Sequence, residues 1–168
     1  MVFKDCTFFS YVLLATAVIL LAGHTHGAGL CDNAPNKQVC DSIVYQRTDP
    51  REAVVAGIHK MVYQSKVAKA VAQNQTKSTK IDACIKEFET GIDNGKRALE
   101  ALAASKYISV RTSIIAAWTN CVVCDKGFGG DPNPIAKSTK LVEDIAAAGI
   151  YLTNLIKWRR ACELYVSG

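Results

Sequence analysis

One apolar stripe in the middle of the chain constrains the fold more than any other feature. Between residues 81 and 102, apolar or small residues recur at alternating steps of four and three: Ile81, Ile85, Phe88, Ile92, Gly95, Leu99 and Leu102. Because an α-helix turns once every 3.6 residues, this spacing places them on a single face. The segment is therefore expected to form an amphipathic helix of about six turns that packs against other helices.

Three further segments show the same period. The next one along the chain carries Tyr107, Val110, Ile114, Ala117, Cys121, Cys124 and Phe128. The last one carries Leu141, Ile145, Ala148, Leu152 and Leu155, and a weaker upstream one carries Val54, Ile58, Met61, Ser65, Ala68 and Ala72. The upstream helix is expected to begin at Asp49-Pro50, an N-cap residue followed by proline in the first turn. Links near 73–79, at 103–106 and at 126–135 then predict an all-α fold, an antiparallel up-down-up-down four-helix bundle over residues 50–160.

The N-terminal residues 1–27 have the features of a secretory signal peptide. Lys4 precedes an apolar run from Tyr11 to Ala22, and small residues follow it. A membrane-spanning helix needs about 20 apolar residues, more than this run supplies. We therefore expect cleavage near Gly27 or Ala28, with a retained anchor as the alternative. The mature chain, residues 28–168, is expected to be a single secreted domain with no membrane contact.

Cleavage leaves six cysteines, and in an oxidising compartment disulfides are the first expectation. Cys31 and Cys40 bracket a segment that can bury little alone, so a local disulfide is expected to staple a helical hairpin over residues 29–47. In the bundle, Cys84 lies about 20 residues before the turn at 103–106 and Cys124 about 18 after it, so their heights differ by only about 3 Å. A Cys84–Cys124 disulfide is favoured, because the heights of Cys84 and Cys121 along the bundle would differ by roughly 7 Å.

Cys121 and Cys162 are expected to be free thiols. The last helix starts near residue 136 and would rise roughly 39 Å by Cys162, past the top of the bundle. Cys121-x-x-Cys124 could instead be half a zinc site or a redox dithiol. However, His59 is the single histidine of the mature chain, and no strand–helix context surrounds the pair. With no Gly-rich loop or paired acids either, we expect no metal, no cofactor, no catalytic residues and no enzyme activity.

The chain carries an excess of five positive charges, which favours acidic partners such as an acidic polysaccharide or protein. The lysines are spread along the sequence, so nucleic-acid binding is not expected. Asn74-Gln75-Thr76 is an acceptor sequence for N-linked sugar and should be exposed.

Four features in order resemble the plant invertase/pectin methylesterase inhibitor family. A signal peptide is followed by Cys31-x8-Cys40, and a third cysteine lies in "IDACIKEFETGIDNGKRALEAL". The fourth lies in "SIIAAWTNCVVCDKGF", where the family pattern identifies Cys124 rather than Cys121 as the family cysteine. "PIAKSTKLVEDIAAAGIYLTNLI" is similar to the family's closing helix. Trp118 and Val123 depart from the usual Leu and Thr.

The resemblance implies a four-helix bundle with an N-terminal hairpin, and a protein that binds a carbohydrate enzyme of the plant cell wall one-to-one and blocks its cleft. The Pro-Lys-Phe segment associated with invertase inhibitors is absent, since the link reads Pro134-Ile135-Ala136. Pectin methylesterase is therefore the expected target, with invertase as the alternative and the apoplast as the expected location. A secreted carrier of small apolar ligands, or a module without inhibitory activity, is the other alternative.

Outward residues of the two middle helices are the candidate partner contacts, and the alternative for each of them is an ordinary solvated helix face. They are Lys86, Asp93, Arg97 and Arg111. Ile115, Trp118 and Val122 form a second apolar stripe on helix 107–124, which is expected to be core, with an exposed binding patch as the alternative.

Overall fold

The computed structural model describes residues 29–166, with side chains as far as residue 156. The signal peptide and the side chain of Cys162 lie outside the described residues, so the expectations about them remain predictions. Five helices make up the described part of the chain, which contains no strand. They are α2 (Lys37–Val44), α3 (Pro50–Gln73), α4 (Thr79–Ala103), α5 (Tyr107–Lys126) and α6 (Ala136–Val166). None of these helices is both long and apolar enough to cross a membrane.

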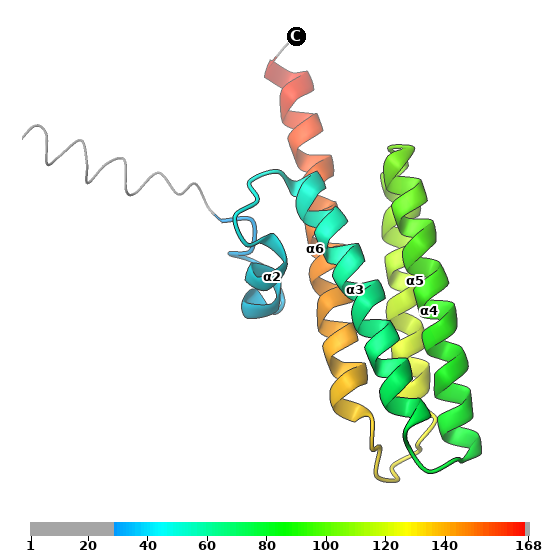
Figure 1. Cartoon of the computed structure of the whole chain (residues 1–168). Coiled ribbons are helices and arrows are strands. Elements are labelled where there is room, and N and C mark those ends of the chain that lie inside the picture. The colour runs from blue at the N-terminus through cyan, green and yellow to red at the C-terminus, as the bar shows by residue number, and fades with distance from the viewer. Residues whose placement is uncertain (1–28, 167–168) are drawn as a thin grey trace, which may run out of the picture.

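The expected four-helix bundle is confirmed. Helices α3, α4, α5 and α6 alternate in direction, and each packs against its two neighbours in a ring that α3 and α6 close (Figure 1). In this ring α3 is diagonal to α5, and α4 is diagonal to α6. The short helix α2 lies outside the bundle against α3 and α6 (Figure 1).

Side-chain caps define where α2, α3 and α4 begin. Asp49 accepts a hydrogen bond from the Arg51 backbone N–H, and Pro50 occupies the first turn of α3, as the sequence predicts. Ser78 caps α4 by accepting from the Ile81 N–H, and Asn36 caps α2 in the same way. The links between the bundle helices are consequently short and fall where they were expected.

The buried faces follow the predicted stripes on α3 and α5 and are displaced on α4 and α6. Every predicted stripe residue of α3 is buried, and on α5 all are buried except the half-buried Tyr107. On α4, Ile85 and Leu99 are half-buried, while Cys84, Gly91 and Ala98 lie inside. On α6 the expectation for Leu141 is wrong, since its side chain is 39% exposed and Val142 is buried. The buried face of α6 runs instead through Val142, Ile145, Ala146, Ala148, Gly149, Leu152, Thr153 and Ile156.

The displacement on α6 has a physical cause. Small residues occupy the positions where α6 approaches its neighbours closely: a Cβ added at Gly149 would lie 3.7 Å from two carbons of Ile114. The buried Thr153 hydroxyl donates to the Gly149 carbonyl at 2.7 Å, so burying it leaves no unpaired group. The small residues Ala146, Ala148, Gly149 and Thr153 therefore make up half of this buried face, and they carry little hydrophobic signal in the sequence.

Among the residues whose side chains are described, disulfides join Cys31 to Cys40 and Cys84 to Cys124. Both match the expected pairs. The Cα atoms of Cys84 and Cys124 are 4.7 Å apart, which is consistent with their nearly equal heights on α4 and α5. Cys121 is buried and free. In the N-terminal extension, residues 30–33 form turns, and α2 is the one helix of the expected hairpin within the described residues.

Candidate functional site

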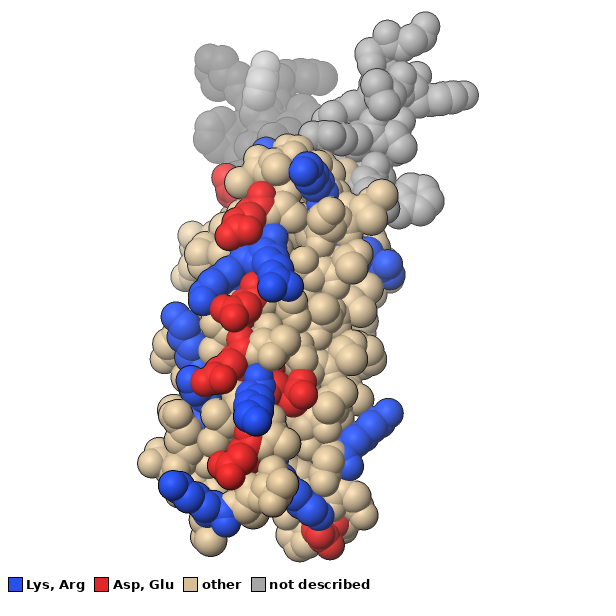
Figure 2. All heavy atoms as spheres, turned by 90° about the vertical axis from the view of Figure 1, so that its right-hand side faces the viewer, with Lys and Arg blue, Asp and Glu red and all other residues tan. Residues whose placement is uncertain are grey.

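The outward face of α5 carries no charge over most of its length. Arg111 is the one charged residue between Ile108 and Cys124. We call this surface the α5 face, and it comprises Ile108, Thr112, Ile115, Trp118, Thr119 and Val123. Figure 2 shows the α4 and α5 side of the molecule, where a strip of alternating acidic and basic residues borders a broad area with few charges. A charge-poor centre of this kind is typical of protein–protein interfaces.

The polar groups of the α5 face are already paired within the helix. The Thr112 hydroxyl donates to the Ile108 carbonyl and the Thr119 hydroxyl to the Ile115 carbonyl, both at 3.0 Å. Covering a hydroxyl whose proton has an internal acceptor carries a small desolvation penalty. A partner could therefore cover this face without supplying an acceptor for each threonine.

The expectation that Ile115, Trp118 and Val122 form core is wrong. Trp118 is 39% exposed, and the other two are half-buried. The inward face of α5 is already filled by the stripe from Val110 to Cys124, which leaves this second stripe on the flank of the helix. The side chains of Ile108 and Val123 add further exposed apolar surface, being 71% and 48% exposed.

Three of the four predicted contact residues lie on one exposed stripe of α4. Lys86, Asp93 and Arg97 are all exposed, and with Thr90 between them they follow steps of four, three and four. Lys96 Nζ bonds Asp93 Oδ1 at 2.8 Å. This hydrogen bond from Lys96 and its charge, followed by the charge of Arg97, hold the pKa of Asp93 below its ordinary value. Asp93 therefore stays ionised in mildly acidic solution.

Arg111 is exposed but lies apart from the α4 stripe. It precedes Trp118 by two helical turns and Asp125 by four, so the three share one flank of α5. Asp125 accepts from the Thr139 hydroxyl of α6 at 3.4 Å, which identifies this flank as the one toward α6. The four predicted residues thus form no single cluster. Three border the α5 face on its α4 side, and Arg111 borders it on the other side.

The α5 face rests on a rigid pair of helices. The Cys84–Cys124 disulfide joins α4 to α5 far from their connecting turn. Between the disulfide and the turn, Asn94 donates to Asn120 at 3.1 Å, and Asn120 donates to Glu87 at 2.6 Å. Sequence analysis missed this polar chain. Its one signal is Asn94, a polar residue directly beside Gly95 of the apolar stripe.

The comparisons with known proteins agree with this architecture. A profile of the plant invertase/pectin methylesterase inhibitor family matches residues 28–155, more than three quarters of the chain. The chain belongs to this family. Members of this family are inhibitors rather than enzymes, so this protein is an inhibitor of the pectin methylesterase or invertase type. Membership of the family implies a carbohydrate-active enzyme as the partner.

Solved structures with the same fold include two from Arabidopsis. A mutant form of a pectin methylesterase inhibitor superposes with a TM-score of 0.65 at 14% identity, covering 74% of this chain and 93% of the other. A second pectin methylesterase inhibitor gives a TM-score of 0.58 at 13% identity, with 74% and 91% covered. At this identity the likeness establishes the fold alone. No curated protein sequence matches.

Within the inhibitor-family bundle, the buried thiol of Cys121 is unsuited to redox or metal chemistry. Burial, and then the charges of Glu143 and Glu87, raise the pKa of Cys121 from 9.0 to about 12, so the reactive thiolate is not formed near neutral pH. No cluster of three or more metal-ligating side chains occurs among the residues that the structure describes.

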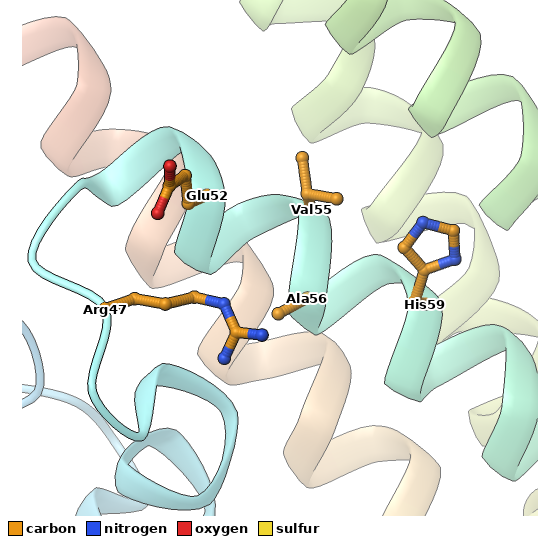
Figure 3. A pocket seen from close by; sticks show the side chains of 5 residues that line it. All are labelled: Arg47, Glu52, Val55, Ala56 and His59. Carbon is orange, nitrogen blue, oxygen red and sulfur yellow. The ribbon is translucent and has the colours of Figure 1, made fainter.

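A shallow groove on α3 is the remaining concave feature of interest. It has a volume of about 480 Å³ and is lined by Arg47, Glu52, Val55, Ala56 and His59. Figure 3 shows Arg47 in the link before α3 and the other four side chains along α3. His59 is exposed. The groove lies on the helix diagonal to α5 and is therefore separate from the α5 face.

Proposed function

We propose that this protein inhibits a pectin methylesterase by laying the α5 face across the active-site cleft of the enzyme. The observation that carries the proposal is the surface pattern of an inhibitor-family bundle: an uncharged face containing Trp118, bordered by Lys86, Asp93 and Arg97 on one side and Arg111 on the other. A dry centre with a charged rim favours tight and oriented binding.

Inhibition of this kind needs no chemistry from the inhibitor. The disulfide and the Asn94–Asn120–Glu87 hydrogen bonds hold α4 and α5 in one arrangement before the enzyme arrives. A surface that is already ordered loses little conformational entropy on binding, so more of the contact free energy appears as affinity. The bound bundle then excludes the substrate polymer by its bulk, in a one-to-one complex.

The link before α6 supports an esterase rather than an invertase as the target. It reads Pro134-Ile135-Ala136, where invertase inhibitors carry Pro-Lys-Phe, and the Ile135 side chain is buried, being only 1% exposed. Ile135 and Ala136 thus stand at the positions where that segment has lysine and phenylalanine. Invertase remains the second candidate because the family covers both kinds of inhibitor.

Secretion into the apoplast and glycosylation are parts of the same proposal. The signal peptide is expected to direct the chain to the secretory pathway. Asn74, the proposed glycosylation site, is exposed at the C-cap of α3. Since α3 is diagonal to α5, a sugar there would leave the α5 face uncovered.

The test is a titration of the mature protein into plant pectin methylesterase and acid invertase assays at mildly acidic pH. We expect the esterase activity to disappear at near-equal stoichiometry while invertase is unaffected. The reverse pattern would establish the second candidate, and no effect on either enzyme would refute inhibition of both.

A pair of matched variants tests the surface. Thr119→Glu buries a charge at the centre of the α5 face and should weaken inhibition about tenfold or more. Ala70→Glu introduces the same group at an exposed position of α3 and should leave inhibition unchanged. Equal effects of the two variants would refute the α5 face as the contact surface.

A further inference from the structure

The excess of positive over negative residues in this protein lies in one segment of the chain. Residues 47–80, which comprise α3, its flanking links and the first two residues of α4, hold seven Lys or Arg and two Asp or Glu. That is an excess of five, equal to the net charge of the chain, and the rest of the sequence holds 13 residues of each sign. Lysines that look evenly spread in the sequence thus leave this segment strongly basic and the remainder of the chain electrically balanced.

Most cations of this segment have no acidic partner among the described residues. Arg47 donates to the Ile43 and Val44 carbonyls, Arg51 to the Leu102 carbonyl, and Lys60 to the Ser42 carbonyl and hydroxyl. These hydrogen bonds fix the side chains but leave their charge uncompensated. Within the described residues, Lys66 and Lys77 make neither a hydrogen bond nor an ion pair through their side chains. Of the seven cations in this segment, Lys69 and Lys80 form ion pairs within the described part of the chain, with Glu89 and Asp131 respectively.

The basic surface is long and carries features that suit a sugar chain. From Arg51 to the end of α3 it extends about 33 Å along the helix axis. The groove at Val55, Ala56 and His59 lies on it, and Tyr63 follows His59 by one turn with a side chain that is 66% exposed. An exposed tyrosine offers a flat apolar ring and a hydroxyl, which can cover the C–H face of a sugar ring and bond its hydroxyl groups.

We propose that the outward side of α3, with Arg47, Arg51, Tyr63, Lys66 and Lys77, binds a linear polyuronate, an acidic polysaccharide whose sugar units carry carboxylates. A line of uncompensated cations raises the local concentration of a polyanion, and Arg and Lys bind carboxylates directly. The choice of a polyuronate rests on the proposed function, because an esterase that hydrolyses sugar methyl esters leaves free carboxylates on its polymer.

A polysaccharide fits this surface better than an acidic protein. The cations run from the link before α3 to the link after it, as a thin linear polyanion requires. An interface with a globular partner instead concentrates its contacts in a compact patch with a buried centre. The α5 face has that compact character, and it lies diagonally across the bundle. The inhibitor could therefore hold the polymer with α3 while α5 remains accessible to the enzyme.

The experiment measures binding of the mature protein to polygalacturonate without any enzyme, so its result is independent of inhibition. The comparison polymers are the same chain fully methyl-esterified and a sulfated dextran. We expect polygalacturonate to bind at low salt, with affinity that falls as salt rises, and to bind more tightly than either comparison polymer. Equal binding of the esterified chain or of the sulfated dextran would overturn the proposal, as would no binding to polygalacturonate.

Two double variants with the same net charge locate the site. Lys66→Gln/Lys77→Gln removes two unpaired cations from the α3 surface and should weaken polymer binding about tenfold. Lys86→Gln/Lys126→Gln removes two exposed cations from α4 and α5. This variant should change the affinity for the polymer by no more than about twofold. Equal weakening would assign the attraction to net charge alone and overturn the site. Loss of enzyme inhibition in Lys66→Gln/Lys77→Gln, with polymer binding intact, would assign α3 to a protein partner instead.

Discussion

Gly95 of α4 lies directly against Val62 of α3. A Cβ built on Gly95 would overlap Val62 Cγ2 and come within 3.4 Å of Met61 Cε, so the two helices meet where α4 has no side chain. Gly95 is buried at this point of closest approach. The glycine therefore sets how near α3 can lie to the α4–α5 pair.

Gly95→Ala should destabilise the protein. Relief of the overlap needs a shift of Val62 or of the helix, and overpacking of this kind costs about 1–3 kcal/mol, partly offset by about 1 kcal/mol of improved helix propensity. Gly91→Ala is the matched control, because its Cβ would meet neighbouring atoms at ordinary distances of 3.8 and 3.9 Å. Urea unfolding followed by circular dichroism should place the control at or above the native stability. A Gly95→Ala variant as stable as Gly91→Ala would contradict the close approach.

The Cys84–Cys124 disulfide should contribute more stability than Cys31–Cys40. The first closes a loop of 40 residues and the second a loop of nine. The chain-entropy estimate is about 4 kcal/mol for the longer loop and about 2.5 kcal/mol for the shorter one. The double variants Cys84→Ser/Cys124→Ser and Cys31→Ser/Cys40→Ser should differ accordingly in unfolding free energy. Peptide mapping of non-reduced protein that joined Cys124 to any residue other than Cys84 would refute the pairing.

Asn120→Ala should lower the free energy of unfolding by about 1–3 kcal/mol, because it leaves the buried Asn94 amide without its acceptor. It also removes a donor from Glu87. Thr119→Ala, at the next and exposed position, should change stability by no more than about 0.5 kcal/mol. Thermal and urea unfolding of the two variants provide the comparison, and equal losses would mean that the polar chain contributes nothing specific.

The thiol of Cys121 should be inert in the folded protein. In a Cys162→Ser background, a thiol reagent at pH 8 should react only when denaturant is added, because burial raises the pKa of Cys121 to about 12 and excludes the reagent. Rapid labelling under native conditions would contradict the buried position.

The same pKa shift gives a pH dependence of stability. The unfolded chain loses the thiol proton near pH 9 and the folded chain only near 12, so the stability from this group is intact below pH 9 and is lost as the pH rises toward 12. Between pH 8 and 10 the native protein should therefore lose more stability than Cys121→Ala, as measured by the free energy of unfolding at each pH. If the unfolding free energy of both proteins fell equally over this pH range, the Cys121 thiol would not be the origin of the pH dependence.

Much of the bundle was predictable from spacing, since a stripe of large apolar residues has one helical interpretation and a turn fixes the relative heights of two helices. Cys84 and Cys124 could be paired on that basis. Leu141 could not be assigned correctly, because the buried face of α6 includes Ala146, Gly149 and Thr153, which carry little hydrophobic signal. The α5 face was missed for the opposite reason, since Ile115 and Trp118 are apolar enough to suggest core although the inner face of α5 was already filled.

The charged candidates illustrate the same limit. Periodicity placed Lys86, Asp93 and Arg97 on one stripe, but their relation to Arg111 depends on which flank of α5 faces α6. Only the packing of α6 decides that, through contacts such as Asp125 with Thr139. The Asn94–Asn120 hydrogen bond likewise depends on the rotation of two helices about their axes, which apolar spacing fixes only coarsely.

The bridge between Cys84 and Cys124 turns the segment between them into a covalent ring, with the 104–106 turn at one end and the sulfur–sulfur bond at the other. A protease that cuts once anywhere inside this ring releases no fragment. A nicked molecule keeps α4 and α5 tethered side by side, and a gel run without reductant cannot tell it from an intact one. A single cut in this ring thus leaves the two helices that carry the candidate enzyme contacts covalently joined.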